Sequence, residues 1–105
     1  MSEISYQDLK QLDPGSYTLI DTRNADNILY GMIPGAIHIP EKELYDHPTK
    51  YTCETSPGSK LVLYCQHGVR SIELAETLKE YGRECLSLEG GYLAYLRELL
   101  YSETQ

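Results

Sequence analysis

The run from Leu61 to Cys65 constrains the fold of this chain more than any other segment. Its five residues, Leu-Val-Leu-Tyr-Cys, are a strand pattern without polar alternation. Such a pattern is typical of a strand buried on both faces of a parallel sheet. Gly68 follows, and residues 72–81 then place apolar side chains on one helical face and charged side chains on the other. Strand, turn and amphipathic helix together predict one unit of an α/β fold.

The remainder of the chain repeats this alternation. Strands are predicted around Ile4 and over residues 17–22, 36–39, 61–65 and 85–88, and helices after a Ser5 cap, over residues 24–30, 41–45 and 72–81, and from Leu93 onward. Pro48 is expected to limit the third helix, and residues 51–60 are expected to be a loop. The pattern predicts one α/β domain over residues 1–105, with a mostly parallel sheet joined by right-handed crossovers.

Composition excludes several kinds of partner. The formal net charge of −7 argues against sequence-independent binding to nucleic acid or to an anionic membrane. No apolar run approaches the length of a membrane span, and the first residues lack the pattern of a signal peptide. The three cysteines, Cys53, Cys65 and Cys85, are an odd number. Without a secretion signal they indicate reduced thiols and a cytoplasmic location.

Three loops are expected to meet at one edge of the sheet, because the carboxyl ends of parallel strands lie together. They follow Asp21-Thr22, Cys65 and Glu89, and they bring Arg23, residues 65–70 and Gly90-Gly91 to one face. Cys85 begins its strand and is expected at the opposite edge as a core thiol, too far from Cys65 for a disulfide. Cys53 is expected at that far edge as a loop thiol.

The loop Cys65-Gln66-His67-Gly68-Val69-Arg70-Ser71 is the candidate active site. A cysteine in front of a helix N-terminus faces unpaired N–H groups and the positive end of the helix dipole, which favour the thiolate. Gly68 lets several N–H groups converge, and Arg70 offers two donors to an anion. His67 is interpreted equally well as a hydrogen-bond donor or as an exposed loop side chain.

Other polar residues have supporting roles or none in this interpretation. Asp21 and Arg23 are expected to brace the loop from the neighbouring strand, which is compatible with a local ion pair. His38 and His47 have no evident partner, and no residues have a convincing metal-ligand spacing. Tyr92 and Tyr95 are interpreted as packing and as the rim of a pocket. We therefore predict neither a metal nor a cofactor.

These motifs resemble the single-domain rhodaneses over nearly the whole chain. Residues 65–71 are similar to the family's C-x-x-G-x-R-[ST] loop. Asp21-Thr22-Arg23 resembles its D-x-R, residues 31–40 its G-H-I-P-G-A-x-x-I-P, and Leu88-Glu89-Gly90-Gly91 its L-x-G-G. The chain departs from the pattern where Met32 replaces a usual His, Asn27 a common Glu and Tyr95 a frequent Trp. The resemblance implies five parallel strands flanked by helices on both faces, and sulfur transfer through a persulfide on Cys65.

The predicted reaction moves a sulfane sulfur from a small anionic, thiosulfate-like donor to cyanide, a thiol or a protein acceptor, without a cofactor. Gln66, His67, Gly68, Val69, Arg70 and Ser71 are the predicted substrate-binding residues. One alternative is a phosphatase or arsenate reductase, although the phosphatase relatives have one more residue between Cys and Arg. Another is a non-catalytic sulfur carrier or sensory domain that docks to a protein. The physiological donor and acceptor stay open.

Overall fold

The computed structural model describes residues 3–54 and 59–103 of the chain. Five strands form one sheet in the order β1-β5-β4-β2-β3, and every pair is parallel. The predicted α/β class and parallel sheet are therefore confirmed. In chain order the elements are β1 (Glu3–Ile4), α1 (Tyr6–Gln11), η1 (Pro14–Ser16), β2 (Tyr17–Asp21), α2 (Ala25–Ile28), β3 (Ile37–His38), α3 (Glu41–Asp46), α4 (Pro48–Glu54), β4 (Lys60–Tyr64), α5 (Arg70–Lys79), β5 (Cys85–Leu88) and α6 (Gly91–Glu103).

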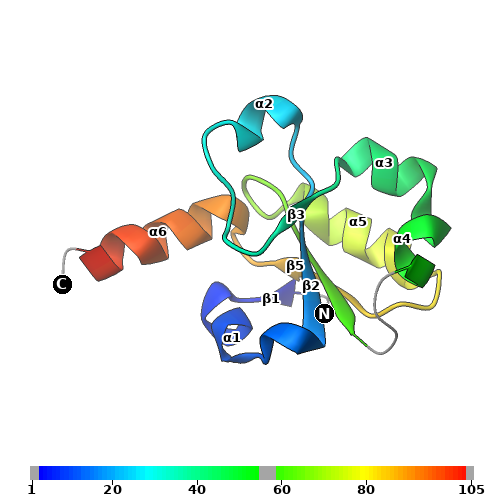
Figure 1. Ribbon diagram of the computed structural model, residues 1–105, viewed down its shortest axis with the longest axis horizontal. Coiled ribbons are helices and arrows are strands. Elements are labelled where there is room, and N and C mark those ends of the chain that lie inside the picture. Colours follow the sequence, from blue (N-terminus) through cyan, green and yellow to red (C-terminus); the bar gives the residue numbers. More distant parts are fainter. Residues whose placement is uncertain (1–2, 55–58, 104–105) are drawn as a thin grey trace.

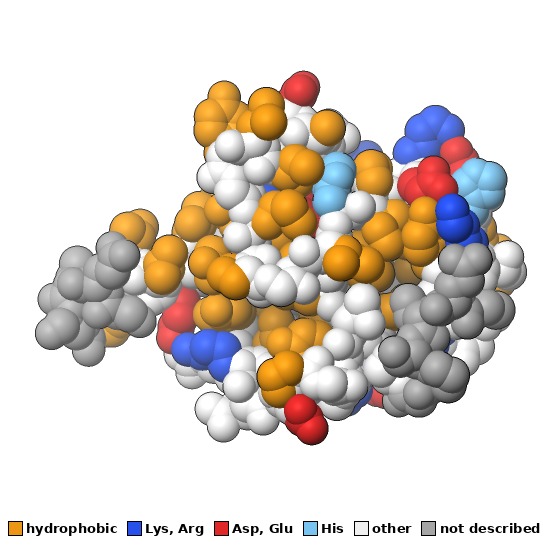
Figure 2. All heavy atoms as spheres, viewed as in Figure 1, with side chains coloured by type: hydrophobic (Ala, Val, Ile, Leu, Met, Phe, Trp, Pro, Cys, Tyr) orange, Lys and Arg blue, Asp and Glu red, His pale blue; other side chains and the backbone are white. Residues whose placement is uncertain are grey.

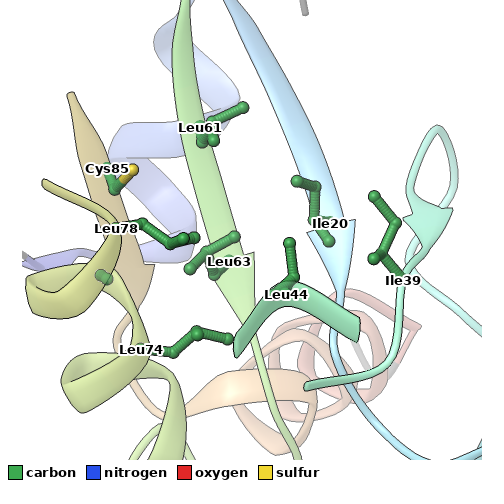
Figure 3. Close-up of a cluster of buried hydrophobic side chains, with 9 residues drawn as sticks. Ile20, Ile39, Leu44, Leu61, Leu63, Leu74, Leu78 and Cys85 are labelled. Carbon is green, nitrogen blue, oxygen red and sulfur yellow. The ribbon is translucent and has the colours of Figure 1, made fainter. Parts of the chain in front are cut away.

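Helices cover both faces of the sheet (Figure 1). Side chains of β4 alternate between two cores, so that Leu61 and Leu63 enter one while Val62 and Tyr64 enter the other. Figure 3 shows the first core, in which Leu44 of α3 and Leu74 and Leu78 of α5 meet the strands. The second core lies under α1 and α6. Burial on both faces explains why the β4 sequence has no polar alternation.

Local boundaries follow their capping residues. Ser5 accepts a hydrogen bond from the Asp8 amide and caps α1, as predicted. Helix α5 begins at Arg70, two residues earlier than its apolar periodicity indicates. Its N-cap residue is Val69, whose side chain makes no cap hydrogen bond. The first amides of α5 are therefore available to another acceptor.

The prediction of a loop over residues 51–60 was wrong in its first part. Helix α4 runs from Pro48 to Glu54. Proline is compatible with the first turn of a helix, where its missing N–H needs no partner, so Pro48 begins a helix here as well as ending α3. Cys53 thus lies in a helix instead of a loop, and its side chain and residues 55–58 are outside the described residues.

Several other elements are shorter than expected, including α2 and β3. In the part of the chain that the structure describes, no helix has the length and apolar character needed to cross a bilayer.

Candidate active site

The ends of β2, β4 and β5 are joined by backbone hydrogen bonds. The Thr22 amide donates to the Tyr64 carbonyl at 3.0 Å, and the Tyr92 amide donates to the Cys65 carbonyl at 2.8 Å. A further bond of 3.2 Å runs from the Leu93 amide to the Gln66 carbonyl. The three loops expected at the carboxyl edge therefore meet around Cys65. The first turn of α6 is hydrogen-bonded to the backbone of the Cys65 loop.

Two glycines permit this close approach. Gly68 has φ +85° and Gly91 has φ +61°, values that side chains rarely tolerate. A Cβ atom on Gly68 would lie 2.7 Å from the Gly90 amide nitrogen, and one on Gly91 would lie 2.3 Å from the Cys65 carbonyl oxygen. The L-E-G-G segment is thus a packing surface for the Cys65 loop.

The Cys65 thiol accepts hydrogen bonds from amides at the start of α5, which has no capping side chain of its own. Its Sγ accepts the Gly68 amide at 3.1 Å and lies 3.4 Å from the Ser71 Oγ, and the residue is 8% exposed. Burial alone would raise the pKa of the Cys65 thiol. Hydrogen bonds from the Ser71 hydroxyl and from the amides of Ser71, Gly68 and Arg70 outweigh burial and lower this pKa below its ordinary value. The site therefore favours a thiolate.

Asp21 and Arg23 form a buried ion pair beside this loop. Arg23 donates to both Asp21 carboxylate oxygens, with Nη2 at 2.7 Å and Nε at 3.0 Å. The same guanidinium donates to the Gly31 carbonyl at 2.5 Å and to Gln66 Oε1 at 3.2 Å. These hydrogen bonds occupy the Arg23 guanidinium with protein acceptors, so it has no pair of N–H groups left to bind an anion side-on.

Aromatic rings complete the brace. The Arg23 guanidinium carbon lies 4.0 Å from the centre of the Tyr92 ring, and Tyr92 stacks on Tyr64 at 6.3 Å. The Tyr64 hydroxyl accepts the Ile33 amide at 3.0 Å. His38, for which the sequence indicated no partner, places Nε2 2.7 Å from the Arg23 carbonyl oxygen. Tyr92 packs as predicted, and it also contacts the brace.

A cavity of about 230 Å³ opens above the Cys65 loop. Arg70 lies at its mouth with its side chain 76% exposed, and its Nε is 3.3 Å from Glu41 Oε2. His67 and Val69 are also exposed. The cavity is lined by Thr22, Arg23, Asn24, Asn27, Glu41, Cys65, Gln66, His67 and Arg70. A second hollow of about 210 Å³ is lined by Cys65, Gln66, His67, Val69 and Arg70.

Exposed apolar side chains follow α2 in the chain. Helix α2, which supplies Asn27 to the lining, is followed by Leu29 and Tyr30, which are 81% and 88% exposed. Figure 2 shows apolar side chains over α2 at the top of the molecule and also across the middle of this face. The larger cavity is lined by the amides of Asn24 and Asn27 on the α2 side and by the charged pair Arg70–Glu41 on the other.

The sequence analysis missed two residues near Cys65. Glu41 lines the cavity and contacts Arg70, and Ser87 of β5 lies 2.6 Å from Ser71, hydroxyl oxygen to hydroxyl oxygen. A signal for Ser87 existed, because it is the lone polar residue in the Cys-Leu-Ser-Leu strand. Glu41 gave no such signal, since a glutamate at the start of a helix is ordinary.

Cys85 lies apart from this site. It pairs in register with Leu61 at the opposite edge of the sheet and is fully buried, as predicted. Burial raises the pKa of the Cys85 thiol to about 11. Of the described cysteine thiols, only Cys65 has a lowered pKa.

Comparison with known proteins gives relatives over most of the chain. Residues 5–98 match the family described as "Rhodanese-like domain". A putative sulfurtransferase of Bacillus subtilis, YtwF, is 37% identical over 73% of this chain and 71% of its own. A sulfurtransferase of Allochromatium vinosum is 33% identical over 92% of this chain and 90% of its own. The crystal structure of a rhodanese-related protein from Thermoplasma volcanium superposes with a TM-score of 0.79 at 28% identity, covering 93% of each chain.

Proposed function

Because this chain belongs to the rhodanese-like domain family, we propose that it is a thiosulfate-type sulfurtransferase in which Cys65 carries the transferred sulfur. The observation that carries the proposal is the setting of the Cys65 Sγ, which receives the Gly68 amide at 3.1 Å and has a lowered pKa at the floor of an open cavity. A thiolate that is both stabilised and accessible is the nucleophile that this chemistry needs.

In the first half-reaction the Cys65 thiolate attacks the outer sulfur of thiosulfate. A sulfur–sulfur bond forms to Cys65, the bond to the sulfonate sulfur breaks, and sulfite leaves with the electron pair. Arg70 is the proposed partner of the departing oxyanion, because its exposed guanidinium lies at the cavity mouth and offers planar donors. The amides of residues 66–71 and the Ser71 hydroxyl stabilise the anionic terminal sulfur that remains.

In the second half-reaction a nucleophile takes the terminal sulfur and restores the thiolate. Cyanide would leave as thiocyanate, and a thiolate acceptor would become a persulfide. The exposed Val69 side chain, which lines the second hollow together with Cys65, supports an organic or protein thiol as the cellular acceptor. The net charge of −7 supports the further proposal that neither nucleic acid nor an anionic membrane is a partner. We also propose a reducing compartment such as the cytoplasm, because catalysis requires a free Cys65.

Phosphoryl transfer is the enzyme activity from which sulfur transfer must be separated. The loop from Cys65 to Arg70 has six residues. Gly68 and Gly91 pack so closely that a Cβ on either would clash, which leaves little room to widen the loop. A persulfide adds one atom to Cys65, whereas a phosphatase must enclose a whole tetrahedral group, so the short loop supports sulfur as the transferred group.

The test is intact mass spectrometry of the purified protein before and after thiosulfate. We expect a gain of one sulfur atom that cyanide or dithiothreitol removes. The gain should be absent from Cys65→Ser and retained in the control Cys85→Ser. A parallel assay offers an aryl phosphate. Hydrolysis of the phosphate that exceeds sulfur transfer and disappears in Cys65→Ser would overturn the proposal, as would sulfur loading on a residue other than Cys65.

A further inference from the structure

Two buried serines lie one behind the other beneath the sulfur of Cys65. Ser71, in the first turn of α5, has its Oγ 3.4 Å from the Cys65 Sγ. Ser87, on β5, has its Oγ 2.6 Å from the Ser71 Oγ. Both serines are fully buried. Ser87 lines neither cavity and contacts the predicted loop through its last residue, Ser71, so it is two hydrogen bonds away from the nucleophile.

When Cys65 is a thiol, its Sγ can donate to the Ser71 Oγ, and either serine can donate to the other. When Cys65 is a thiolate, the number of available protons sets the direction of both hydrogen bonds. Each hydroxyl has one proton to donate and can accept from others. If Ser71 donated to Ser87, its proton would face away from Cys65. If Ser87 donates to Ser71, the Ser71 proton is free to point at the sulfur. A thiolate accepts hydrogen bonds and donates none, so the second arrangement gains a charge-assisted bond that the first lacks.

The surroundings of Ser87 favour the same direction. Its neighbour on the same face of β5 is Cys85, which is part of the apolar core. Among the described residues, Ser71 is the side chain to which the Ser87 hydroxyl is hydrogen-bonded. A buried hydroxyl without a partner is unfavourable, so Ser87 is held to Ser71. Chains of hydroxyls also polarise one another, which strengthens the terminal bond to the anion.

We propose that Ser87 is a positioning residue that donates to Ser71 and thereby holds the Ser71 proton on the sulfur of Cys65. The thiolate that attacks the donor and the thiolate released at the end of the cycle are stabilised in the same way. No proton leaves either serine during the cycle. The effect on turnover rests on the proposed function, whereas the effect on the thiolate does not.

The experiment measures the rate of Cys65 alkylation by iodoacetamide against pH, with peptide mapping to separate Cys65 from the other cysteines. A hydrogen bond to a charged group corresponds to a midpoint shift of about one pH unit, so we expect Ser71→Ala to raise the midpoint by about that amount. Ser87 acts through Ser71, and we expect Ser87→Ala to raise the midpoint by roughly half a unit. Ser87→Thr keeps a hydroxyl and should restore most of the shift.

The double variant Ser71→Ala/Ser87→Ala separates positioning from packing. The proposal requires that Ser87→Ala adds no shift once Ser71 has been removed. The control Thr52→Val removes another buried hydroxyl, which bonds to the Pro48 carbonyl in α4, and should leave the midpoint unchanged. Thermal unfolding of each variant checks that it is folded, and Ser87→Cys replaces Ser87→Ala if the alanine variant is not.

Two results would overturn the inference. One is an unchanged midpoint in Ser87→Ala when Ser71→Ala moves it. The other is a Ser87→Ala shift of equal size with and without Ser71, because this would be a packing effect. Neither depends on sulfur transfer: if thiosulfate loads no sulfur on the wild-type protein, the proposed function fails while the alkylation profiles still decide the role of Ser87.

Discussion

Replacing Arg23 by methionine tests the buried brace behind the Cys65 loop. The substitution keeps a long side chain but removes the donors to Asp21, Gly31 and Gln66. The Asp21 carboxylate is 0% exposed. Of the hydrogen bonds that it accepts from Arg23, only the one from the backbone amide, at 2.9 Å, would remain. Removing one partner of a buried ion pair costs about 3–5 kcal/mol, because the remaining charge is uncompensated. The loss is a large share of the roughly 5–15 kcal/mol typical of a whole domain.

Urea unfolding followed by far-ultraviolet circular dichroism measures this loss. With a slope of about 2 kcal/mol per molar urea, the midpoint should fall by about 2 M. The matched control is Lys10→Met, which removes the exposed pair between Lys10 and Glu98, 3.0 Å apart. Exposed pairs contribute at most about 1 kcal/mol, so this midpoint should hardly move.

A double variant examines the cause of the loss. Asp21→Asn/Arg23→Met leaves no buried charge and should recover part of the stability that Arg23→Met alone loses. If Arg23→Met unfolds at the same urea concentration as Lys10→Met, the pair does not stabilise the fold in the way argued here. Sulfur loading should also fall in Arg23→Met, because Gln66 loses the hydrogen bond that Arg23, two residues after β2, donates to it.

Four further substitutions or measurements follow from the site. Arg70→Ala should reduce kcat/KM for thiosulfate with little effect on unfolding, and Arg70→Lys should restore only part of it, since an ammonium cannot make a planar two-point contact; equal kinetics in the alanine variant would contradict the role of Arg70. Glu41→Gln should raise kcat/KM for thiosulfate several-fold at low salt, because Glu41 competes with the donor for Arg70, and a decrease would refute this. Gly91→Ala should disturb the Cys65 loop and lower sulfur loading, whereas the control Gly35→Ala, which has a similarly positive φ of +88° but nothing within 4 Å of the added Cβ, should not. Since the pKa of Cys65 is lowered, its alkylation should already be fast below the ordinary thiol pKa of about 8.5 and should slow as the pH falls through the Cys65 value; Cys85, whose pKa is raised to about 11, should stay protonated and unlabelled at pH 8, and preferential labelling of Cys85 would contradict both assignments.

The parts of the fold that could be predicted are those with a strong local pattern. The apolar run of β4 and the periodicity of α5 identified the central strand and its helix, and parallel connection then brought the three loops together. Helix α4 was missed because Pro48 was interpreted only as a helix stop, although the same residue is well suited to a first turn. The early start of α5 was missed because no capping side chain precedes it, and the acceptor for its first amides is the Cys65 thiol itself.

The residues of the candidate site likewise fall into those that the sequence alone indicates and those that it does not. Residues 65–71 are contiguous in the sequence, so the sequence alone identifies them. Glu41 and Ser87 reach the site from α3 and β5, and their contacts depend on how those elements pack against α5. No local pattern encodes such contacts. The partner of Gln66 was equally hidden, because Arg23 reaches it only when β2 and β4 lie side by side.

The charge balance of the site explains how the same hydrogen-bond donors around Cys65 could act in both halves of the proposed sulfur transfer. Arg23 is neutralised by Asp21, and Arg70 is partly offset by Glu41. The remaining stabilisation of the Cys65 anion comes from backbone amides, the Ser71 hydroxyl and the N-terminus of α5. A cysteine thiolate and a cysteine persulfide each carry one negative charge, displaced by a single sulfur atom. In the proposed cycle, fixed N–H donors around that path would stabilise both anions without moving a proton, so the loaded and unloaded forms would need little rearrangement of the loop.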